Sequence, residues 1–469
     1  MKRMIIVIFH LMICAAFAAA QESPDQKIDA LFKPFTGNVP GCTVGAVQNG
    51  KLLFTKAYGM ADLEHNVPLT PASPFYMASV SKQVTAMAIL LLADDGKLQL
   101  SDSIRKSVPE LPEYADKITL YHLLTHTSGI RDYLTLGALA AWPEGAVFTD
   151  ENSLRLIARQ DALNFEPGSA HDYSNSGYFL LSLVVKRVAG KDLNAFAQER
   201  IFGPLAMNSS RFQHDHSVLV PGKAFGYQFA NAAWHASNST LDVVGDGGMY
   251  SSVEDMLRWA ANFNEPKIGA KALPVMQTRG KLSNGQSFDY GMGLAPGEYR
   301  GLKTVSHGGG LAGYRTHILW LPAQKFSVVC LCNNGNANPA LLTLQVAEIF
   351  LSGEMSAAPA AGKPQAGPAT APGAAQDSPA ELSQEQQKEF IGEYRSKELE
   401  AAYRIFIYQG VLTIQPGDSP RVRLLSAGPD LMKIWGRGID LAFQRDTSGK
   451  ITGFLLNAGR VRAVRFIRN

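Results

Sequence analysis

Residues 353–383, GEMSAAPAAGKPQAGPATAPGAAQDSPAELS, divide the chain into two unequal parts. Alanine, proline and glycine dominate this segment and aromatic residues are absent, so it cannot bury a core and is expected to be a semi-extended linker. We therefore expect a large domain over residues 25–352 and a small domain over residues 384–469.

The first residues, MKRMIIVIFHLMICAAFAAAQE, have the pattern of an export signal. Two basic residues precede an apolar core from Met4 to Phe17, and a small-residue cleavage site ends at Ala20. The sequence thus predicts a signal peptide over residues 1–20 and a protein that is periplasmic or secreted. No later segment is apolar over the length of a bilayer, so no stable membrane span is expected.

The large domain has strand patterns at both ends. Asn49-Gly50 separates two apolar runs near its start, which is a strong signal of a two-residue hairpin. Near its end, THILWLPAQKFSVVCLCNN is typical of a second hairpin that turns at residues 322–324. Helical patterns lie between them, for instance over residues 153–160 and 178–188. This arrangement predicts an α+β domain, in which one antiparallel sheet is assembled from both ends and helices are segregated around it.

Short β patterns fill the small domain, separated by Gly, Asn, Asp and Pro turns. They predict a small all-β sandwich or barrel. Several arginines cluster near its end, and a solvated strand face is favoured over a basic patch because no aromatic residues are interleaved. These residues are Arg460, Arg462, Arg465 and Arg468.

Three cysteines follow the predicted signal, namely Cys42, Cys330 and Cys332. An odd number leaves at least one thiol unpaired in a monomer. Cys330 and Cys332 would point to the same face of one strand, where neighbours make a poor disulfide, so buried free thiols are favoured.

Ser79 and Lys82 stand at the start of a nearly continuous apolar segment, ASVSKQVTAMAILLLA. One helical turn separates them, so their side chains can meet, whereas Ser81 and Lys82 diverge. The helix start favours an alkoxide on Ser79, and partial burial of Lys82 favours a neutral amine that accepts the serine proton. The alternative is an ordinary N-cap serine with a lysine that reaches solvent.

Two further motifs could complete a site. Tyr173 and Asn175 are two apart on an expected loop, so a proton-relaying phenol and a carboxamide that orients the lysine and holds a substrate carbonyl could face the serine together. The glycines in SHGGG, residues 306–310, would let another backbone approach closely. On an edge strand, the Gly310 N–H could join the Ser79 N–H in an oxyanion hole. Each motif alone is more often a turn.

In this order, the three motifs resemble those of the serine β-lactamase and penicillin-binding-protein superfamily. The closest branch contains the class C β-lactamases, the D-alanyl-D-alanine carboxypeptidases, the D-aminopeptidases and the β-lactamase-like esterases. The resemblance extends over nearly the whole large domain, through LLTHTSGI, FEPGSAHDYSNSGY, GDGGMYSS and HGGGLAGY. It implies a β-lactamase/DD-peptidase-like antiparallel sheet flanked by helices, with a helical subdomain. The small domain resembles the lipocalin-like modules appended to some of these hydrolases, on weaker grounds.

The resemblance also implies roles for the matching residues. Ser79, Lys82 and Tyr173 would be catalytic, with an acyl-enzyme formed on the serine. Substrate would be bound by the residues that match the Y-x-N and H-x-G elements, namely Asn175, His307, Gly308, Gly309 and Gly310.

His307 departs from the pattern, because a typical class C β-lactamase carries a lysine there, whose fixed charge can hold a carboxylate. Histidine is mostly neutral at pH 7, although it can still donate a hydrogen bond. This difference favours an esterase or a hydrolase of D-amino-acid-containing peptides over a β-lactamase. Arg315 could supply the missing cation or could lie on the surface.

We therefore expect an exported serine hydrolase with a small-molecule ester or peptide substrate and no metal or organic cofactor. The charge balance, 44 Lys and Arg against 41 Asp and Glu, gives no reason to expect a nucleic-acid partner. His122 and His126 lie four apart on an expected helix, but no third ligand accompanies them. Three alternatives stay open: a class C-type β-lactamase, an acylated sensor that does not turn over, and a ligand-binding small domain with the hydrolase as scaffold. The oligomeric state is also open.

Overall fold

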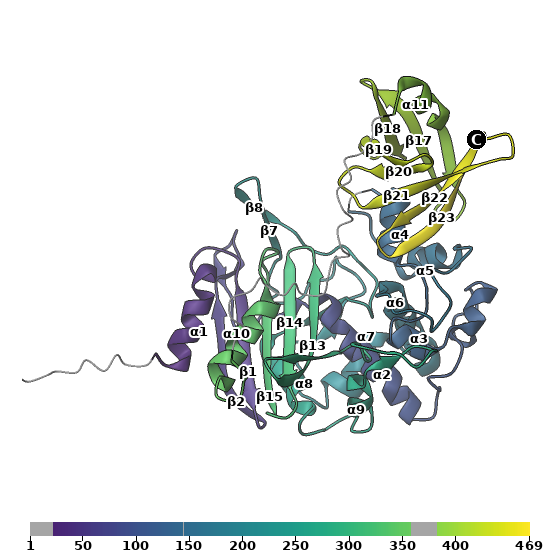
Figure 1. Ribbon diagram of the computed structural model, residues 1–469. Coiled ribbons are helices and arrows are strands. Elements are labelled where there is room, and N and C mark those ends of the chain that lie inside the picture. Colours follow the sequence, from purple (N-terminus) through teal and green to yellow (C-terminus); the bar gives the residue numbers. More distant parts are fainter. Residues whose placement is uncertain (1–21, 144, 358–381) are drawn as a thin grey trace, which may run out of the picture.

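The computed structural model describes residues 22–143, 145–357 and 382–469 (Figure 1). The predicted signal peptide, residues 1–20, lies outside the described residues, and so does most of the predicted linker, residues 353–383. Within the described part of the chain, no helix has the length and apolar character that crossing a bilayer requires.

A six-stranded antiparallel sheet forms the centre of the large domain (Figure 1). Strands from the start of the domain pair with strands from its end, so the predicted assembly from both ends is confirmed. In order across the sheet, the strands are β12 (Ala295–Tyr299), β13 (Leu302–Leu311), β14 (Tyr314–Leu321), β15 (Phe326–Cys332), β1 (Cys42–Gln48) and β2 (Lys51–Tyr58).

Both predicted hairpins are present in this sheet. Asn49 and Gly50 join β1 to β2 with φ values of 50° and 72°, the left-handed conformation that a type I′ turn needs at both positions. The second hairpin joins β14 to β15 through residues 322–325.

Helices cover both faces of the sheet. One face packs against α1 (Pro24–Phe32) and α10 (Pro339–Leu351), which lie side by side in Figure 1. The other face packs against α8 (Val253–Asn262) and against a short 3₁₀ turn, η2 (Ala78–Ser81), which leads into α2 (Lys82–Asp94). The first eleven residues of α2 are all buried, which explains its nearly continuous apolar sequence.

The remaining elements of the large domain build a helical part beside the sheet. The helices are α3 (Leu120–Leu124), α4 (Tyr133–Leu139), α5 (Asp150–Ala158), α6 (Asn175–Ala189), α7 (Leu193–Ala197) and α9 (Ala272–Gln277), with the short turns η1 (Lys33–Phe35), η3 (Ile104–Lys106), η4 (Glu113–Lys117) and the π-helical η5 (Gln198–Phe202). The short strands are β3 (Met60–Asp62), β4 (Val67–Pro68), β5 (Phe75–Tyr76), β6 (Arg211–Phe212), β7 (Tyr227–Ala230), β8 (Ala233–Ala236), β9 (Met249–Ser251), β10 (Gly280–Lys281) and β11 (Ser287–Phe288).

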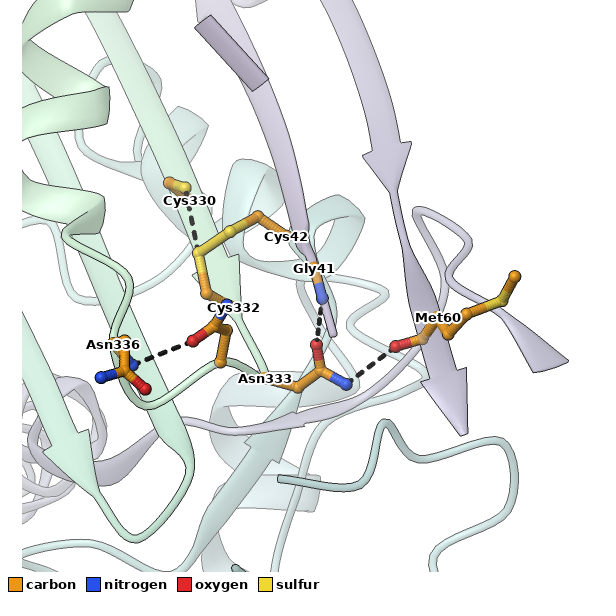
Figure 2. Close-up of a disulfide and its surroundings, with 8 residues drawn as sticks. Gly41, Cys42, Met60, Cys330, Cys332, Asn333 and Asn336 are labelled. Atoms are coloured by element: carbon orange, nitrogen blue, oxygen red, sulfur yellow. Dashed lines mark hydrogen bonds between the residues drawn. A yellow bond between two sulfur atoms is a disulfide. The ribbon is translucent and has the colours of Figure 1, made fainter. Parts of the chain in front are cut away.

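A disulfide joins Cys42 on β1 to Cys332 on β15, so the prediction of a buried free thiol is wrong for Cys332 (Figure 2). The two residues are direct cross-strand partners, with Cα atoms 4.0 Å apart. Among the described residues only Cys330 is a free cysteine, buried with its Sγ 3.8 Å from that of Cys332. The spacing of Cys330 and Cys332 along one strand argued against a bond between them. The partner of Cys332 is instead Cys42 on the neighbouring strand β1, and the register of β1 against β15 decides this pairing.

The disulfide belongs to a row of cross-strand partners that reaches the far side of the sheet. Its β15 cysteine, Cys332, is the partner of Arg315 on β14, and Arg315 is the partner of Gly310 on β13. Next to the disulfide, the side chain of Asn333 accepts a hydrogen bond from the N–H of Gly41 at 2.8 Å (Figure 2). The ends of β1 and β15 are thus joined both covalently and through this asparagine.

A closed barrel of eight antiparallel strands follows, which confirms the predicted all-β class (Figure 1). Helix α11 (Gln384–Phe390) precedes the strands β16 (Gly392–Ser396), β17 (Ala401–Tyr408), β18 (Val411–Pro416), β19 (Val422–Gly428), β20 (Leu431–Ile434), β21 (Ile439–Arg445), β22 (Ile451–Ala458) and β23 (Val461–Arg468). Because β16 pairs with both β17 and β23, the barrel has no open edge.

The barrel packs on the helical part of the large domain, and Figure 1 shows it over α4 and α5. Leu136, Leu139 and Leu156 of these helices belong to the hydrophobic cluster of the barrel. An ion pair between Arg131 and Glu398 is buried at the same contact. Apolar packing and a charge pair therefore hold the barrel in place.

Candidate active site

Ser79 occupies the second position of η2, directly before α2. Its neighbour Ala78 has a φ of 47°, a left-handed conformation that residues other than glycine rarely adopt. Two hydrogen bonds hold this turn: the Thr316 hydroxyl donates to the Met77 carbonyl at 2.9 Å, and the Met77 N–H donates to the Met249 carbonyl at 2.8 Å. The sheet thus supports a strained turn that presents a half-buried serine.

The side chain of Ser81 stabilises the same turn through two hydrogen bonds. Its hydroxyl donates to the Ala78 carbonyl at 2.6 Å and accepts from the Met249 N–H at 3.3 Å. The side chain is fully buried. The structure therefore brings Lys82 to Ser79 and leaves Ser81 aside, as the helical spacing predicts.

Lys82 is completely buried, and its Nζ contacts three oxygen atoms. These are Ser79 Oγ at 3.1 Å, Asn175 Oδ1 at 2.9 Å and the Asp246 carbonyl at 2.7 Å. In the charged form, three acceptors satisfy all three N–H groups. In the neutral form, two N–H groups suffice for Asn175 and Asp246, and the lone pair accepts the Ser79 proton. The geometry suits a lysine that exchanges a proton with this serine.

Asp132 fixes the direction of the Asn175 carboxamide. One carboxylate oxygen of Asp132 accepts from the Asn175 backbone N–H at 2.8 Å and from its Nδ2 at 2.9 Å. Because Nδ2 faces a carboxylate, the amide oxygen faces Lys82. The other oxygen of Asp132 caps α4 through the Thr135 N–H at 3.0 Å. Asn175 therefore orients Lys82, and one of its amide N–H groups has no acceptor among the described residues.

Tyr173 lies against Lys82, whose Nζ is 4.9 Å from the centre of the ring. The ring of His126 is a second close neighbour, with a centroid distance of 4.1 Å. The buried Tyr173 hydroxyl makes no hydrogen bond to any described residue, Ser79 included. Since buried hydroxyls normally have a partner, this oxygen keeps unused hydrogen-bonding capacity beside Lys82.

His126 does not lie on a helix with His122, because α3 ends at Leu124 and His126 has a φ of 56°. Its Nδ1 accepts a hydrogen bond from the Ser174 N–H at 3.2 Å. Burial lowers the pKa of His126 well below its usual value, so the imidazole is neutral. The expected pair of histidines one turn apart is thus absent, and His126 instead supports the ring of Tyr173.

His307 is buried and neutral. Its Nδ1 lies 2.7 Å from the Gly308 carbonyl, which can only accept, so Nδ1 carries the proton and Nε2 accepts from the Tyr290 hydroxyl at 3.0 Å. Burial, together with the charge of Lys82, lowers the pKa of His307 to about 3. The hydrogen bond that we expected His307 to offer a substrate is therefore used within its own strand.

The glycines after His307 lie on a free stretch of sheet edge. Because β12 begins with Ala295 opposite Ser306, residues 307–311 pair with β14 on one side only. Leu311 and Tyr314 flank a two-residue turn and form a hydrogen-bonded pair, so the next pair, Gly310 and Arg315, is not hydrogen-bonded. The N–H of Gly310 therefore points away from β14. This orientation is the one that the predicted oxyanion hole needs.

Gly309 is the glycine that permits the close approach. It faces η2, where a Cβ would lie 2.4 Å from the Met77 carbonyl oxygen and 2.4 Å from Thr316 Oγ1. Gly308 and Gly310 face the other side, where a Cβ would make ordinary contacts at 3.6 Å and 3.5 Å. The serine turn can therefore pack on β13 only because residue 309 has no side chain.

Arg315 lies on the face of the sheet opposite to η2. It is the cross-strand partner of Gly310 and shares its face with His317, whose Nδ1 lies 2.8 Å from the hydroxyl of Thr343 on α10. Its guanidinium donates to two backbone carbonyls of its own hairpin turn. Arg315 therefore does not supply the cation that His307 fails to provide.

Asp246 places a buried carboxylate beside Lys82. One oxygen accepts from the Tyr133 hydroxyl at 3.0 Å, and the other has no partner among the described residues. Burial raises the pKa of Asp246 to about 6, against the opposing effect of the Lys82 charge. At neutral pH this carboxylate is mostly ionised and lies beside the Lys82 amine.

Arg460 in the β22–β23 turn and Arg462 on β23 are 44% and 58% exposed, as the predicted solvated face requires, but both also contact the large domain. The Arg460 Cζ lies 4.8 Å from the centre of the Tyr173 ring. An Nη of Arg462 lies 3.6 Å from an Asp172 oxygen. Both arginines therefore stand at the contact between the barrel and the site.

Five residues of the site were not predicted, namely Asp132, His126, Tyr290, Asp246 and Arg460. Two of them stand inside stretches that carried the resemblance, LLTHTSGI and GDGGMYSS, so position within a motif was a usable signal. Asp132 and Tyr290 reach the site from separate segments of the chain, and Arg460 comes from the other domain. No local pattern points to these three.

Comparison with known proteins adds two findings on the sequence. The family described as Beta-lactamase matches residues 28–348. The D-aminopeptidase of Gluconobacter oxydans (strain 621H) is 29% identical over 327 residues, which are 69% of this chain and 60% of that protein. The chain thus spans about three-fifths of the length of the D-aminopeptidases that it matches.

Solved structures share the fold at lower identity. An octameric penicillin-binding protein homologue from Pyrococcus abyssi superposes with a TM-score of 0.60 at 22% identity, covering 94% of this chain and 98% of that one. The D-amino acid amidase from Ochrobactrum anthropi SV3 superposes with a TM-score of 0.57 at 20% identity, covering 71% of this chain and 99% of that one.

Proposed function

The chain belongs to the β-lactamase family, and from that premise we propose that it is a serine hydrolase that works through an acyl-enzyme on Ser79. The observation that carries the proposal is the position of Lys82 Nζ, 3.1 Å from Ser79 Oγ. Asn175 and the Asp246 carbonyl leave the amine no other direction in which to accept a proton.

Neutral Lys82 takes the proton of Ser79 as Oγ attacks the carbonyl carbon of the substrate. The carbonyl oxygen becomes an oxyanion between the N–H groups of Ser79 and Gly310. Tyr173, whose hydroxyl has no partner, relays a proton to the leaving group, which departs as an amine or alcohol. Water then attacks the acyl-serine ester, releases the acid and returns the proton to Ser79.

The substrates we propose are esters or peptides that contain D-amino acids. D-aminopeptidases among the curated relatives and a D-amino acid amidase among the solved structures support this class. A neutral His307 does not replace the lysine that a typical class C β-lactamase carries at this position to hold the carboxylate of a β-lactam, so this position gives no support to the β-lactamase alternative.

We also propose that the protein acts in the periplasm or outside the cell. The N-terminal export pattern motivates this proposal. The Cys42–Cys332 disulfide supports it, because disulfides persist mainly in oxidising compartments.

The test is hydrolysis of a p-nitrophenyl acyl ester by the protein and by Ser79→Ala. We expect an early burst followed by turnover, both lost in Ser79→Ala. Ser81→Ala is the matched control, since that serine lies in the same turn and does not contact Lys82. Its loss of two buried hydrogen bonds should lower stability by about 1–3 kcal/mol but preserve the burst.

Three other outcomes have separate meanings. A burst without turnover would favour the acylated sensor. Equal hydrolysis by Ser79→Ala would refute the site. Comparison of D-alanine and L-alanine p-nitroanilides then tests the stereochemical class, and faster cleavage of the L-isomer would contradict it.

A further inference from the structure

The hairpin between β22 and β23 brings the tip of the barrel to the site. The carbonyl of Arg460 at this tip accepts from the Asp132 N–H at 3.4 Å and from Asn164 Nδ2 at 2.9 Å. Asn164 Oδ1 in turn accepts from the Arg462 N–H at 2.9 Å. Backbone bonds therefore fix Arg460 relative to the large domain, independently of its side chain.

The side chain of Arg460 stands above Tyr173 with hydrogen-bonding capacity to spare. Its Cζ is 4.8 Å from the ring centre, and Lys82 Nζ is 4.9 Å from the same centre. The Arg460 side chain is 44% exposed, and none of its N–H groups makes a hydrogen bond to a described residue. Its ion-pair partner, Asp132, is 3.8 Å away and already accepts from Asn175 and Thr135.

No other described cation beside the Tyr173 ring is available to an anionic group. His307 is neutral, and Arg315 lies on the opposite face of the sheet. Lys82 is buried and has three acceptors. Arg462, on the same hairpin, is paired with Asp172. Arg460 and Arg462 are both exposed and charged, with unused donors, but only Arg460 lies against the ring of Tyr173.

We propose that Arg460 binds a carboxylate of the substrate, such as the C-terminal carboxylate of a D-peptide, next to Ser79. This proposal rests on the proposed function, since it assigns the substrate of the same site. A planar guanidinium can hold a carboxylate through two parallel N–H···O bonds, and the Arg460 Cζ lies 4.8 Å from the centre of the Tyr173 ring, which also contacts Lys82. The barrel is thereby a part of the substrate site and selects for an acid over an uncharged end.

The test measures binding to the full-length Ser79→Ala protein, which cannot consume the probe. The probes are N-acetyl-D-alanyl-D-alanine and its C-terminal amide, which differ in the charge of one end. By calorimetry we expect the acid to bind about tenfold to a hundredfold more tightly than the amide, the range of a charged hydrogen-bonded pair. Adding Arg460→Gln should remove this preference, and Arg460→Lys should restore part of it.

Arg462→Gln is the matched control, because it removes a cation from the same hairpin that is paired with Asp172. It should keep the preference for the acid. The proposal fails if the acid and the amide bind equally, if neither binds at millimolar concentration, or if Arg460→Gln keeps the preference. The hydrolase proposal is judged separately by the ester burst, so the two can fail independently.

Discussion

Asp132 and Asn175 are joined twice, since one carboxylate oxygen receives both the backbone N–H and the side-chain Nδ2 of the asparagine, at 2.8 Å and 2.9 Å. The asparagine oxygen is 2.9 Å from Lys82 Nζ, and that Nζ is 3.1 Å from Ser79 Oγ. The direction of the lysine amine therefore depends on a carboxylate that touches neither the lysine nor the serine.

Asp132→Ala should lower kcat by about tenfold to a hundredfold, because the freed carboxamide no longer holds Lys82 in line with Ser79. The substitution also removes the N-cap of α4, at a cost of about 1 kcal/mol or more. Asp192→Ala is the control, since it removes the N-cap carboxylate of α7 away from the site. Ester kinetics and urea unfolding of both variants separate the effects, and an equal loss of kcat would contradict the positioning role.

Gly309→Ala should displace η2 from β13, because the new Cβ would lie 2.4 Å from the Met77 carbonyl oxygen. We expect a loss of about 1–3 kcal/mol in unfolding free energy. The shift of Ser79 should also lower kcat/KM by at least about tenfold. Gly353→Ala, where a Cβ would meet nothing within 4 Å, should change neither quantity. A fully active Gly309→Ala protein would show that the contact is dispensable.

Glu398→Ala should loosen the barrel, because it leaves the Arg131 guanidinium buried without a counter-charge. The two side chains are only 1% and 4% exposed, and breaking such a pair costs about 3–5 kcal/mol. Glu400→Ala breaks the neighbouring ion pair, in which Arg159 is 36% exposed and Glu400 is 55% exposed. Because this pair is exposed to solvent, its loss should cost less than about 1 kcal/mol. Urea unfolding compares them, and similar losses would mean that the buried pair does not secure the contact.

Asp246 should make the protein less stable as pH rises from 4 to 6. Burial raises the pKa of Asp246 from 3.8 to about 6, so in this range the folded chain keeps a proton that the unfolded chain releases. Relative to Asp246→Asn, the parent should therefore lose roughly 2–3 kcal/mol of unfolding free energy between pH 4 and pH 6, and no more above that. Urea unfolding at pH 4, 5, 6 and 7 measures the difference. Parallel pH profiles would mean that this carboxyl titrates normally.

Local spacing was enough to predict much of the fold. A type I′ turn needs positive φ at two residues, and Asn49-Gly50 adopts it readily, so this dipeptide predicted its hairpin. The i, i+3 spacing of Ser79 and Lys82 predicted that their side chains meet. Alternation and turn residues were likewise enough for the all-β class of the barrel. In each case the atoms that interact are within a few residues of one another.

Contacts set by register or by domain packing escaped prediction. The Cys42–Cys332 pairing depends on which strand lies beside β15, and Arg460 reaches Tyr173 only because the barrel packs on α4 and α5. His307 could be recognised as a departure from a lysine, but its burial and its two hydrogen bonds depend on Tyr290 and on the strand itself. These features arise from chain segments that no spacing rule connects.

The disulfide also bears on when the protein can first act. It joins residues separated by 290 positions, and the Thr316 hydroxyl that holds the serine turn is 239 positions beyond Met77. Contacts over such separations form late, after the intervening chain exists and its loop has closed. A growing chain that ends before β15 has the nucleophile but lacks the strands that support it. Synthesis order thus postpones hydrolysis until the large domain is complete.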